Sequence, residues 1–468
     1  MNGVLTLLCL FVCAVIVLAV PGFISPWGAD YGVTNVFDTG RAVLLCTALS
    51  LIAGLIISRQ PEDRQFLLRI FIFGILIRLI LGTAIFVFRG QEFFGGDALT
   101  YDFLGFAQIS SWGGDRYYGQ VIYNHLGHTG GTGWGMVYLV AGIYTVIGRN
   151  VLAVQFVNAV LGAATAVIIY LCAIHVFNNL RVARISALAV AFFPSLVLWS
   201  SQGLKDGPIV FFLALSILAT LRLSRKFDLK YMAVLVFSLF AILSLRFYVF
   251  YMITVAVGGA FLIGSGKVSS LNFIRQTAII IILGLSLTYV GITRYTKQLE
   301  HYGNLERIQR SRQDSAVRGE SGFGQQSDVS TSEGALSTIP IGMVYLLFAP
   351  FPWQLASLRQ SITLPEMIIW WASFPLLILG LWFSIKYRLR QISPILIFTI
   401  MLSLAYSVFQ GNVGNAYRQR SQLLVFYFIF IAVGYVLLSE KHEERKRREM
   451  MEPEPLPGRI AASDWLRR

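Results

Sequence analysis

Long apolar runs recur along this chain from residue 4 to residue 438, and they constrain its fold more than any other feature. A helix needs roughly 17 to 25 mostly apolar residues to cross a bilayer. The charged residues make up only 13% of the chain, against about 25% in soluble domains. We therefore expect an all-α, polytopic transmembrane helix bundle of about 12 spans. The candidate spans are 4–24, 41–58, 66–88, 151–177, 183–200, 207–223, 229–246, 247–264, 273–293, 367–385, 392–409 and 421–438.

Two further apolar stretches, 133–148 and 339–356, are short or interrupted by glycine and proline. Lys and Arg collect in cytoplasmic loops, so the charge of the loops indicates whether these two stretches cross the membrane. If neither stretch crosses and the N-terminus is cytoplasmic, the basic cluster 222–230 and the basic tail face the cytoplasm. The loop 294–338 then lies outside with its six basic residues, which opposes the trend. We predict that both stretches are interfacial or re-entrant segments.

Composition divides the chain into three parts. Residues 1–65 hold two N-terminal transmembrane helices, residues 66–438 form the main bundle with outer loops 89–150 and 294–338, and residues 439–468 form a charged cytoplasmic tail. The first run lacks the positive n-region of a cleaved signal peptide, so we expect a retained helix. The net charge of +14 lies in short breaks between apolar runs. This position favours a role in membrane topology and phosphate binding over nucleic-acid binding.

The most specific local signal is Gly95-Gly-Asp97-Ala-Leu-Thr-Tyr101-Asp102, which follows the third span. Two glycines let the chain turn sharply and approach a ligand. The apolar pattern after Asp97 predicts an amphipathic helix at the membrane interface, where lipid phosphates lie. Asp97 is thus a candidate catalytic carboxylate, with Tyr101 and Asp102 in support. The alternative is that Asp97 only caps the helix, and the two roles are compatible.

Two further polar clusters fall between spans on the same predicted side. The first contains Lys205 and Asp206, and such a pair at the mouth of a bundle is costly unless it is used or solvated. The second contains Tyr417, Arg418 and Arg420, just before the last span. Arginine offers planar, permanently charged donors that suit phosphate. We predict that Lys205, Arg418 and Arg420 bind phosphate. Snorkelling to lipid headgroups is the alternative for the arginines, and helix capping is the alternative for Asp206.

Three weaker candidates complete the set. Arg78 lies midway along span 66–88, and an ionisable residue inside the membrane is functional by default. Its alternative role is a structural pair inside the bundle. His125 and His128 flank a glycine-rich outer stretch and are candidate acid–base or ligand groups, although loop histidines are usually neither. The four cysteines lie in apolar runs, which favours small buried side chains over disulfides or a metal site.

Together these residues resemble the GT-C superfamily of membrane glycosyltransferases, in particular its protein O-mannosyltransferase and aminoarabinose-transferase-like (family 39-like) branch. The resemblance covers most of residues 66–438. The sequence departs from the family by lacking its Pro-Pro, by having one acidic residue where an Asp-Glu pair is common, and by its two extra N-terminal helices. The resemblance rests on the outer acidic residue Asp97 with Tyr101, the stretch 131–138, the second outer acidic residue Asp206, and the late pair Arg418 and Arg420.

The resemblance implies a GT-C-like catalytic domain over residues 66–438, with a cavity on the outer face and a polyprenyl-phosphate-linked sugar as donor. Asp97 would act as general base toward an acceptor hydroxyl, or would hold a divalent metal ion. The arginines would stabilise charge that develops on the leaving phosphate. The acceptor would be a glycan, a lipid or a protein. The enzyme would lie among the lipids of a bacterial inner membrane, without a nucleic-acid partner.

Two alternatives use the same features. A polymerase or ligase of lipid-linked glycans also pairs outer arginines with pyrophosphate lipids. A lipid or glycan transporter without catalysis would need a continuous polar path, whereas the spans carry few charges. Release of free polyprenyl phosphate in the presence of an acceptor would distinguish the transferase from both.

Overall fold

The computed structural model describes residues 3–24, 27–93, 96–128, 133–264, 304–318, 322–323, 328–355 and 358–451. These residues form helices and no strand, which confirms the predicted helical class. Apolar runs become helices because backbone groups in hydrocarbon must be bonded within their own segment. In chain order the helices are α1 (Gly3–Ile24), the 3-10 helix η1 (Trp27–Tyr31), α2 (Val36–Ser58), α3 (Arg64–Val87), α4 (Gly90–Phe93), α5 (Asp97–Trp112), α6 (Arg116–His128), α7 (Trp134–Ile147), α8 (Val151–Phe177), α9 (Leu180–Phe192), α10 (Pro194–Ser200), α11 (Asp206–Arg225), α12 (Leu229–Leu245), α13 (Phe247–Gly264), α16 (Leu305–Arg318), α17 (Ser332–Phe348), α18 (Leu358–Phe409) and α19 (Val413–Met451).

Six helices in the described part of the chain are long and apolar enough to cross a membrane, or seven if the bent pair α9 and α10 counts as one span. Five shorter apolar helices accompany them. The predicted count of 12 is therefore not confirmed, although a bundle with several candidate spans is. The two stretches predicted to be interfacial form α7 and α17, which both belong to the shorter group. The predicted span 273–293 lies outside the described residues.

Three predicted spans have a different continuity in the structure. The range 183–200 is interrupted where α9 ends and α10 begins at Pro194, with a bend of 55°. Proline has no N–H, and its ring clashes with the preceding turn, so the helix breaks there. Conversely, α18 spans both 367–385 and 392–409, with a kink at Arg388 (φ −134°, ψ 18°). Its two legs run along α19 in opposite senses, as the pairs Glu366–Tyr417 and Gly380–Phe430, then Phe398–Phe426 and Tyr406–Gln422, indicate.

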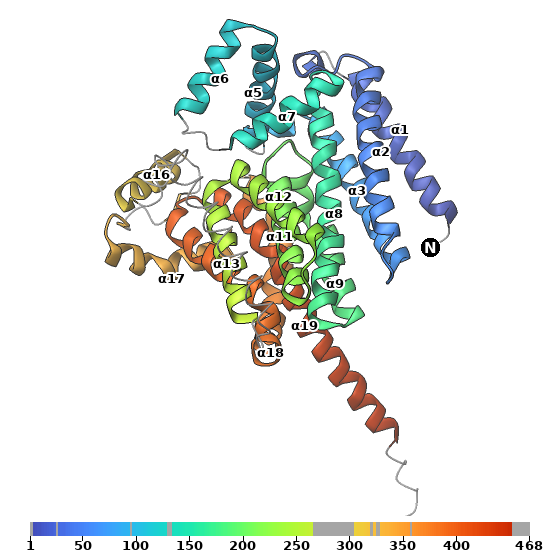
Figure 1. The fold of residues 1–468 in the computed structure, drawn as a ribbon, viewed down its shortest axis with the longest axis vertical. Coiled ribbons are helices and arrows are strands. Elements are labelled where there is room, and N and C mark those ends of the chain that lie inside the picture. Colours follow the sequence, from blue (N-terminus) through green and yellow to red (C-terminus); the bar gives the residue numbers. More distant parts are fainter. Residues whose placement is uncertain are drawn as a thin grey trace, which may run out of the picture.

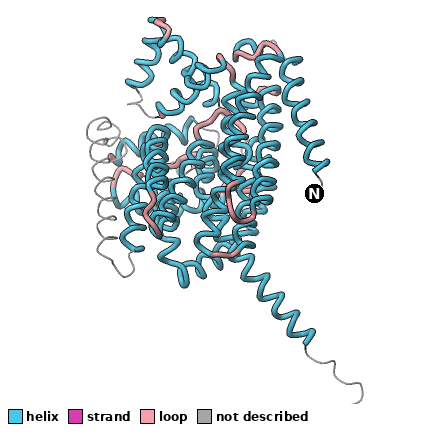
Figure 2. The backbone as a smooth tube through the Cα atoms, turned by 45° about the vertical axis from the view of Figure 1, so that its right-hand side comes forward, coloured by secondary structure: helices cyan, strands magenta, loops and turns pink. Residues whose placement is uncertain are grey.

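The buried helices α8 and α19 organise the bundle. α8 packs against α2, α3, α9 and α11, and α19 packs against α9, α11, α17 and α18. α5 and α6 stand together at one end of the bundle, while α19 extends past the opposite end (Figure 1). It continues as a helix to Met451, beyond the predicted start of the tail at residue 439. Short loops connect most of the described helices (Figure 2).

Candidate active site

Arg418, near the start of α19, joins two carboxylates from distant parts of the chain. Its Nε donates to Asp206 Oδ2 at 2.6 Å, and its Nη1 donates to Asp97 Oδ2 at 2.6 Å. Asp97 is the first residue of α5, and Asp206 is the first residue of α11. The N-terminal ends of three helices therefore meet at one end of the bundle, where their dipoles favour negative charge. The structure thus brings together three residues that the sequence singled out.

Neither carboxylate caps its helix. Gly96 occupies the N-cap position of α5 in the left-handed conformation (φ 66°), which glycine adopts without strain. Lys205 occupies the N-cap position of α11, without a side-chain capping hydrogen bond. The alternative interpretation of Asp97 and Asp206 as N-caps is therefore wrong, and both carboxylates instead bind Arg418.

Asp206 is the buried centre of this cluster, with an exposed fraction of 1%. Its Oδ1 also accepts a hydrogen bond from Arg246 Nη2 at 3.2 Å. Arg246 lies between α12 and α13, and its Nη1 donates to the Tyr406 hydroxyl at 3.4 Å. A buried carboxylate costs several kcal/mol unless it is paired and hydrogen-bonded. Two guanidinium groups supply that pairing, so Asp206 fixes the position of both.

The loop before Asp206 is held by a side chain from α8. Asn158 Nδ2 donates to the carbonyl oxygens of Gln202 at 2.7 Å and Leu204 at 2.8 Å. Pro208 then lies in the first turn of α11, where a missing N–H costs nothing. The loop is therefore fixed at both ends, and Lys205 and Asp206 are held in defined positions. The sequence analysis did not identify Asn158, although a buried Asn inside an apolar span was a usable signal.

Lys205 extends from this loop toward the start of α7. A Cβ built on Gly133 would lie 3.7 Å from Lys205 Nζ, so the ammonium group approaches the backbone there. Burial is the main cause that lowers the pKa of Lys205 to about 8. The charge of Arg246 also lowers it, whereas the charge of Asp206 opposes the shift. The stretch 131–138, which carries part of the family resemblance, thus begins beside the cluster. Residues 129–132 lie outside the described part of the chain.

The cluster carries more positive than negative charge and has one open side. Its cations are Lys205, Arg246 and Arg418, and its anions are Asp97 and Asp206. The side chain of Asp97 is 51% exposed, whereas that of Asp206 is fully buried. An anion that enters beside Asp97 would therefore meet excess positive charge and helix N-termini. Such an arrangement suits the binding of a phosphate group.

Tyr101 and Asp102 have different roles although they are adjacent. Tyr101 lies one helical turn beyond Asp97 on the same face of α5. Burial, followed by the charges of Asp97 and Asp206, raises its pKa, so it remains a neutral hydroxyl near the cluster. Asp102 faces away and binds Arg149 Nη2 at 2.5 Å and the Tyr144 hydroxyl at 2.6 Å. Asp102 therefore attaches α5 to the end of α7 and does not join the cluster.

Arg420 and Tyr417 belong to a second cluster. Arg420 Nη1 donates to the carbonyl oxygens of Leu347 at 2.9 Å and Ala349 at 3.1 Å. The Tyr417 hydroxyl donates to Glu366 Oε2 at 2.9 Å. These contacts attach α19 to α17 and α18. Residues two apart on a helix point in different directions, so Arg420 does not point where Arg418 points. The structure therefore separates Arg420 from Arg418, and the predicted pair of phosphate-binding arginines does not share one site.

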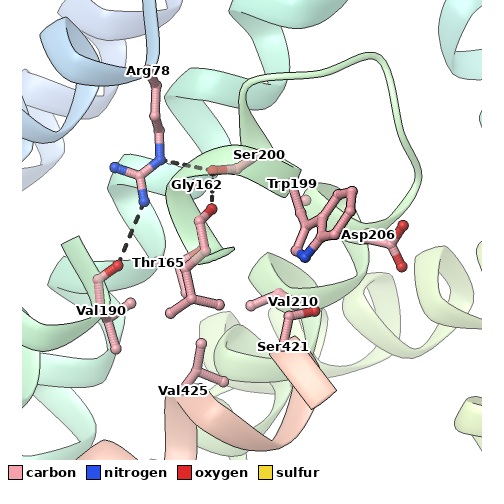
Figure 3. Close-up of a pocket in the computed structure, with 12 residues that line it drawn as sticks. Arg78, Gly162, Thr165, Val190, Trp199, Ser200, Asp206, Val210, Ser421 and Val425 are labelled. Carbon is pink, nitrogen blue, oxygen red and sulfur yellow. Dashed lines mark hydrogen bonds between the residues drawn. The ribbon is translucent and has the colours of Figure 1, made fainter. Parts of the chain in front are cut away.

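Arg78 satisfies the backbone at the α9–α10 break. Its Nη1 donates to the Ala191 carbonyl at 2.8 Å, its Nη2 to the Val190 carbonyl at 3.5 Å, and its Nε to Ser200 Oγ at 2.8 Å. Pro194 has no N–H to offer the Val190 carbonyl, so the guanidinium replaces it. A cavity of about 20 Å³, room for about one water, lies beside this group. The Asp206 carboxylate points away from Arg78 (Figure 3). The contacts of Arg78 are structural.

The remaining candidates lie outside the Arg418 cluster or outside the described side chains. His125 lies on α6, where burial lowers its pKa. His128 ends α6, and its side chain is not among those described. In the described part of the chain, no three His, Cys, Asp or Glu side chains gather as metal ligands would. One oxygen of Asp97 already accepts from Arg418, and the described residues supply no further set of ligands around it, so this donor set does not fit a metal ion.

Residues 134–290 match the family model described as dolichyl-phosphate-mannose-protein mannosyltransferase. The matched segment runs from α7 past α13 and includes Lys205, Asp206 and Arg246, whereas Asp97 and Arg418 lie outside it. No curated protein matches this chain. The match supports a membrane glycosyltransferase of the GT-C superfamily, in agreement with the resemblance in the sequence, but it does not distinguish the branch.

Proposed function

We propose that this protein transfers a sugar from a polyprenyl-phosphate-linked donor to a hydroxyl group of a glycan, lipid or protein on the outer face of a bacterial inner membrane. The observation that carries the proposal is the Arg418 cluster, where excess positive charge and a half-exposed carboxylate share one open side. Such a transfer requires a phosphate site and a general base in contact. The family match over residues 134–290 supports the same reaction class.

In the proposed mechanism, Arg418 and Lys205 bind the donor phosphate, and Asp97 removes the proton from the acceptor hydroxyl. As the acceptor oxygen bonds to the anomeric carbon, the bond from that carbon to the phosphate oxygen breaks. The lipid phosphate leaves with the electron pair, and Arg418 stabilises its charge. Asp206 and Arg246 position Arg418 from the buried side. Arg420 has no part in this proposal, since its contacts lie with α17 and α18.

The contact between Asp97 and Arg418 suggests the order in which the donor and the acceptor bind. Asp97 and the donor phosphate would compete for Arg418 Nη1, which donates to Asp97 in this structure. A phosphate that takes this position releases a half-exposed carboxylate beside the donor. The base then becomes available only when the donor is bound, which favours donor binding before acceptor binding.

The test is the Asp97→Asn variant, measured as purified protein in lipid nanodiscs. Asn keeps the size of Asp and loses its basicity, so turnover should fall by roughly a hundredfold or more. Donor affinity should stay the same or increase, because a neutral amide competes less well for Arg418. Asp115→Asn is the matched control: Asp115 is an exposed carboxylate at the start of α6, and it should keep both turnover and donor affinity.

The products distinguish the proposal from its alternatives. A transferase releases free polyprenyl phosphate only when acceptor is present. Release of polyprenyl pyrophosphate would identify a polymerase or ligase, and movement of the intact lipid-linked sugar without release would identify a transporter. Near-normal turnover in Asp97→Asn would show that the base lies elsewhere.

A further inference from the structure

α16 docks on the bundle through one narrow stripe of residues. Ile308, Arg312 and Ala316 are buried, and their spacing of four places them on one face of the helix. Most other residues of α16 are exposed, among them Arg307 and Arg310. An amphipathic helix normally buries apolar side chains along such a stripe. Arg312 therefore occupies a position where an apolar residue is expected.

The guanidinium group of Arg312 has no hydrogen-bond partner among the residues that the structure describes. Its exposed fraction is 2%, and none of its three side-chain nitrogens bonds to a described group. The three other arginines that are buried in the described part of the chain differ from it. Arg78 and Arg420 donate to backbone carbonyls, and Arg246 donates to Asp206. Burying a cation without an anion or a carbonyl beside it costs free energy. A bound anion would offset this cost at Arg312.

Arg312 lies against the turn that leads into α19. A Cβ built on Gly411 would lie 2.8 Å from Arg312 Cγ, so only glycine allows this approach. Asn412 Nδ2 donates to the Ser315 carbonyl at 3.4 Å, which attaches α16 to the same turn. Arg418 follows six residues after Asn412, on the order of 9 Å along the helix. Arg312 thus lies at the same end of the bundle as the Arg418 cluster.

We propose that Arg312 forms a second anion site, which binds a phosphate group between α16 and the α18–α19 turn. The guanidinium group offers a planar fork of donors that matches phosphate oxygens, and burial would strengthen each contact. The exposed Arg307 and Arg310 on the same helix add positive potential that attracts the anion. The phosphate would come either from the lipid carrier or from a water-soluble phosphate compound. The proposal does not depend on the assigned roles of Asp97 and Arg418.

Hydrogen–deuterium exchange with inorganic phosphate tests this site without any transfer assay. Phosphate should slow amide exchange in α16 of the wild-type protein. Arg312→Met keeps an unbranched chain and removes the charge, so it should leave α16 docked and abolish its protection by phosphate. Arg310→Met, an exposed arginine on the same helix, should keep it. Exchange at residues 97–101 reports the Arg418 cluster separately and should respond to phosphate in all three proteins.

The outcomes decide the proposal. Equal protection of α16 in the wild type and in Arg312→Met, or no protection in the wild type at saturating phosphate, would overturn it. If Arg312→Met misfolds, Arg312→Lys provides the test. It keeps the charge, so phosphate should still protect α16 in part. Protection by polyprenyl phosphate in nanodiscs would identify the lipid carrier as the source, whereas protection by inorganic phosphate alone would identify a water-soluble ligand.

Discussion

At the scale of single residues, the deepest buried carboxylate sets the geometry of the candidate site. Asp206 is fully buried and holds two arginines, whereas Asp97 is half exposed and holds one. Losing Asp206 would leave Arg246 and Arg418 without their shared anion, while losing Asp97 would leave Arg418 still paired. The two carboxylates are therefore suited to different tasks. Asp206 holds the two arginines in position, whereas Asp97 can be displaced from Arg418 and act as a base.

Donor binding should depend on pH through Lys205, whose pKa burial lowers to about 8. The charged groups that face it are Arg246, Asp206, Arg418 and Asp97. Below this pH the ammonium group is charged and attracts phosphate, and above it the charge is lost. Donor affinity should therefore fall as pH rises through about 8, by roughly tenfold for one charged hydrogen bond. Bound phosphate favours the charged form and raises the pKa of Lys205, so the fall should begin at the pKa of the free site and end at the higher pKa of the donor-bound site.

The measurement is donor affinity across this pH range for the wild type and for Lys205→Met. The variant should bind more weakly at neutral pH and show a flat profile near pH 8. The same slope in both proteins would assign the titration to another group.

Most residues of the cluster could be predicted from the sequence, because charges between apolar runs are rare and conspicuous. Asp97, Lys205, Asp206 and Arg418 were all singled out in this way. The sequence analysis did not single out Arg246, although a charge between two spans with no turn residues was a usable signal. The separation of Arg420 from Arg418 could not be predicted without knowing which face of α19 meets α11 and which meets α18.

At the scale of elements, α5 carries Asp97 on a helix that stands at the end of the bundle. Its attachment depends on the buried pair Asp102–Arg149 and on the Tyr144 hydroxyl. Asp102→Ala should lower the free energy of unfolding by roughly 3 kcal/mol, the lower part of the range for a broken buried pair, because Arg149 is partly exposed. Turnover should fall as well, since α5 would no longer hold Asp97 against Arg418.

Thermal unfolding in nanodiscs measures this effect. Glu443→Ala is the control, because it removes an ion pair with Arg181 that is exposed on both sides and should change stability little. Unchanged stability and turnover in Asp102→Ala would show that α5 is held by its apolar contacts alone.

The helices were more predictable than their breaks. The apolar runs at 66–88, 151–177 and 207–223 correspond closely to α3, α8 and α11. Pro194 lies at the break between α9 and α10, but proline is also tolerated within membrane helices, and the sequence analysis predicted one continuous span over 183–200. The kink at Arg388 has neither proline nor glycine at its centre. Only the packing of two legs against α19 requires it.

At the scale of the whole molecule, the candidate site and the basic end of the bundle lie apart. α19 begins beside the Arg418 cluster and extends past the opposite end (Figure 1). Arg181, at the start of α9, pairs with Glu443 at 2.9 Å, so the α8–α9 turn shares that far end with the tail. The positive charge of this far end favours the cytoplasm. The Arg418 cluster at the opposite end would then face outward. The arginines of α16 lie near the cluster and oppose this trend.

The orientation can be tested with single cysteines in a background whose four native cysteines are replaced by alanine. Position 414 is exposed near the candidate site, position 115 is exposed beyond the other end of α5, and positions 226 and 390 are exposed near the basic end. In sealed cells, an impermeant thiol reagent should label 115 and 414 and should reach 226 and 390 only after lysis, because the basic loops should be cytoplasmic. Each variant should retain transfer activity, so that labelling reports the native topology. Labelling of 226 or 390 before lysis would place the Arg418 cluster on the cytoplasmic side, and the proposed outward transfer would then be wrong even if Asp97 is the base.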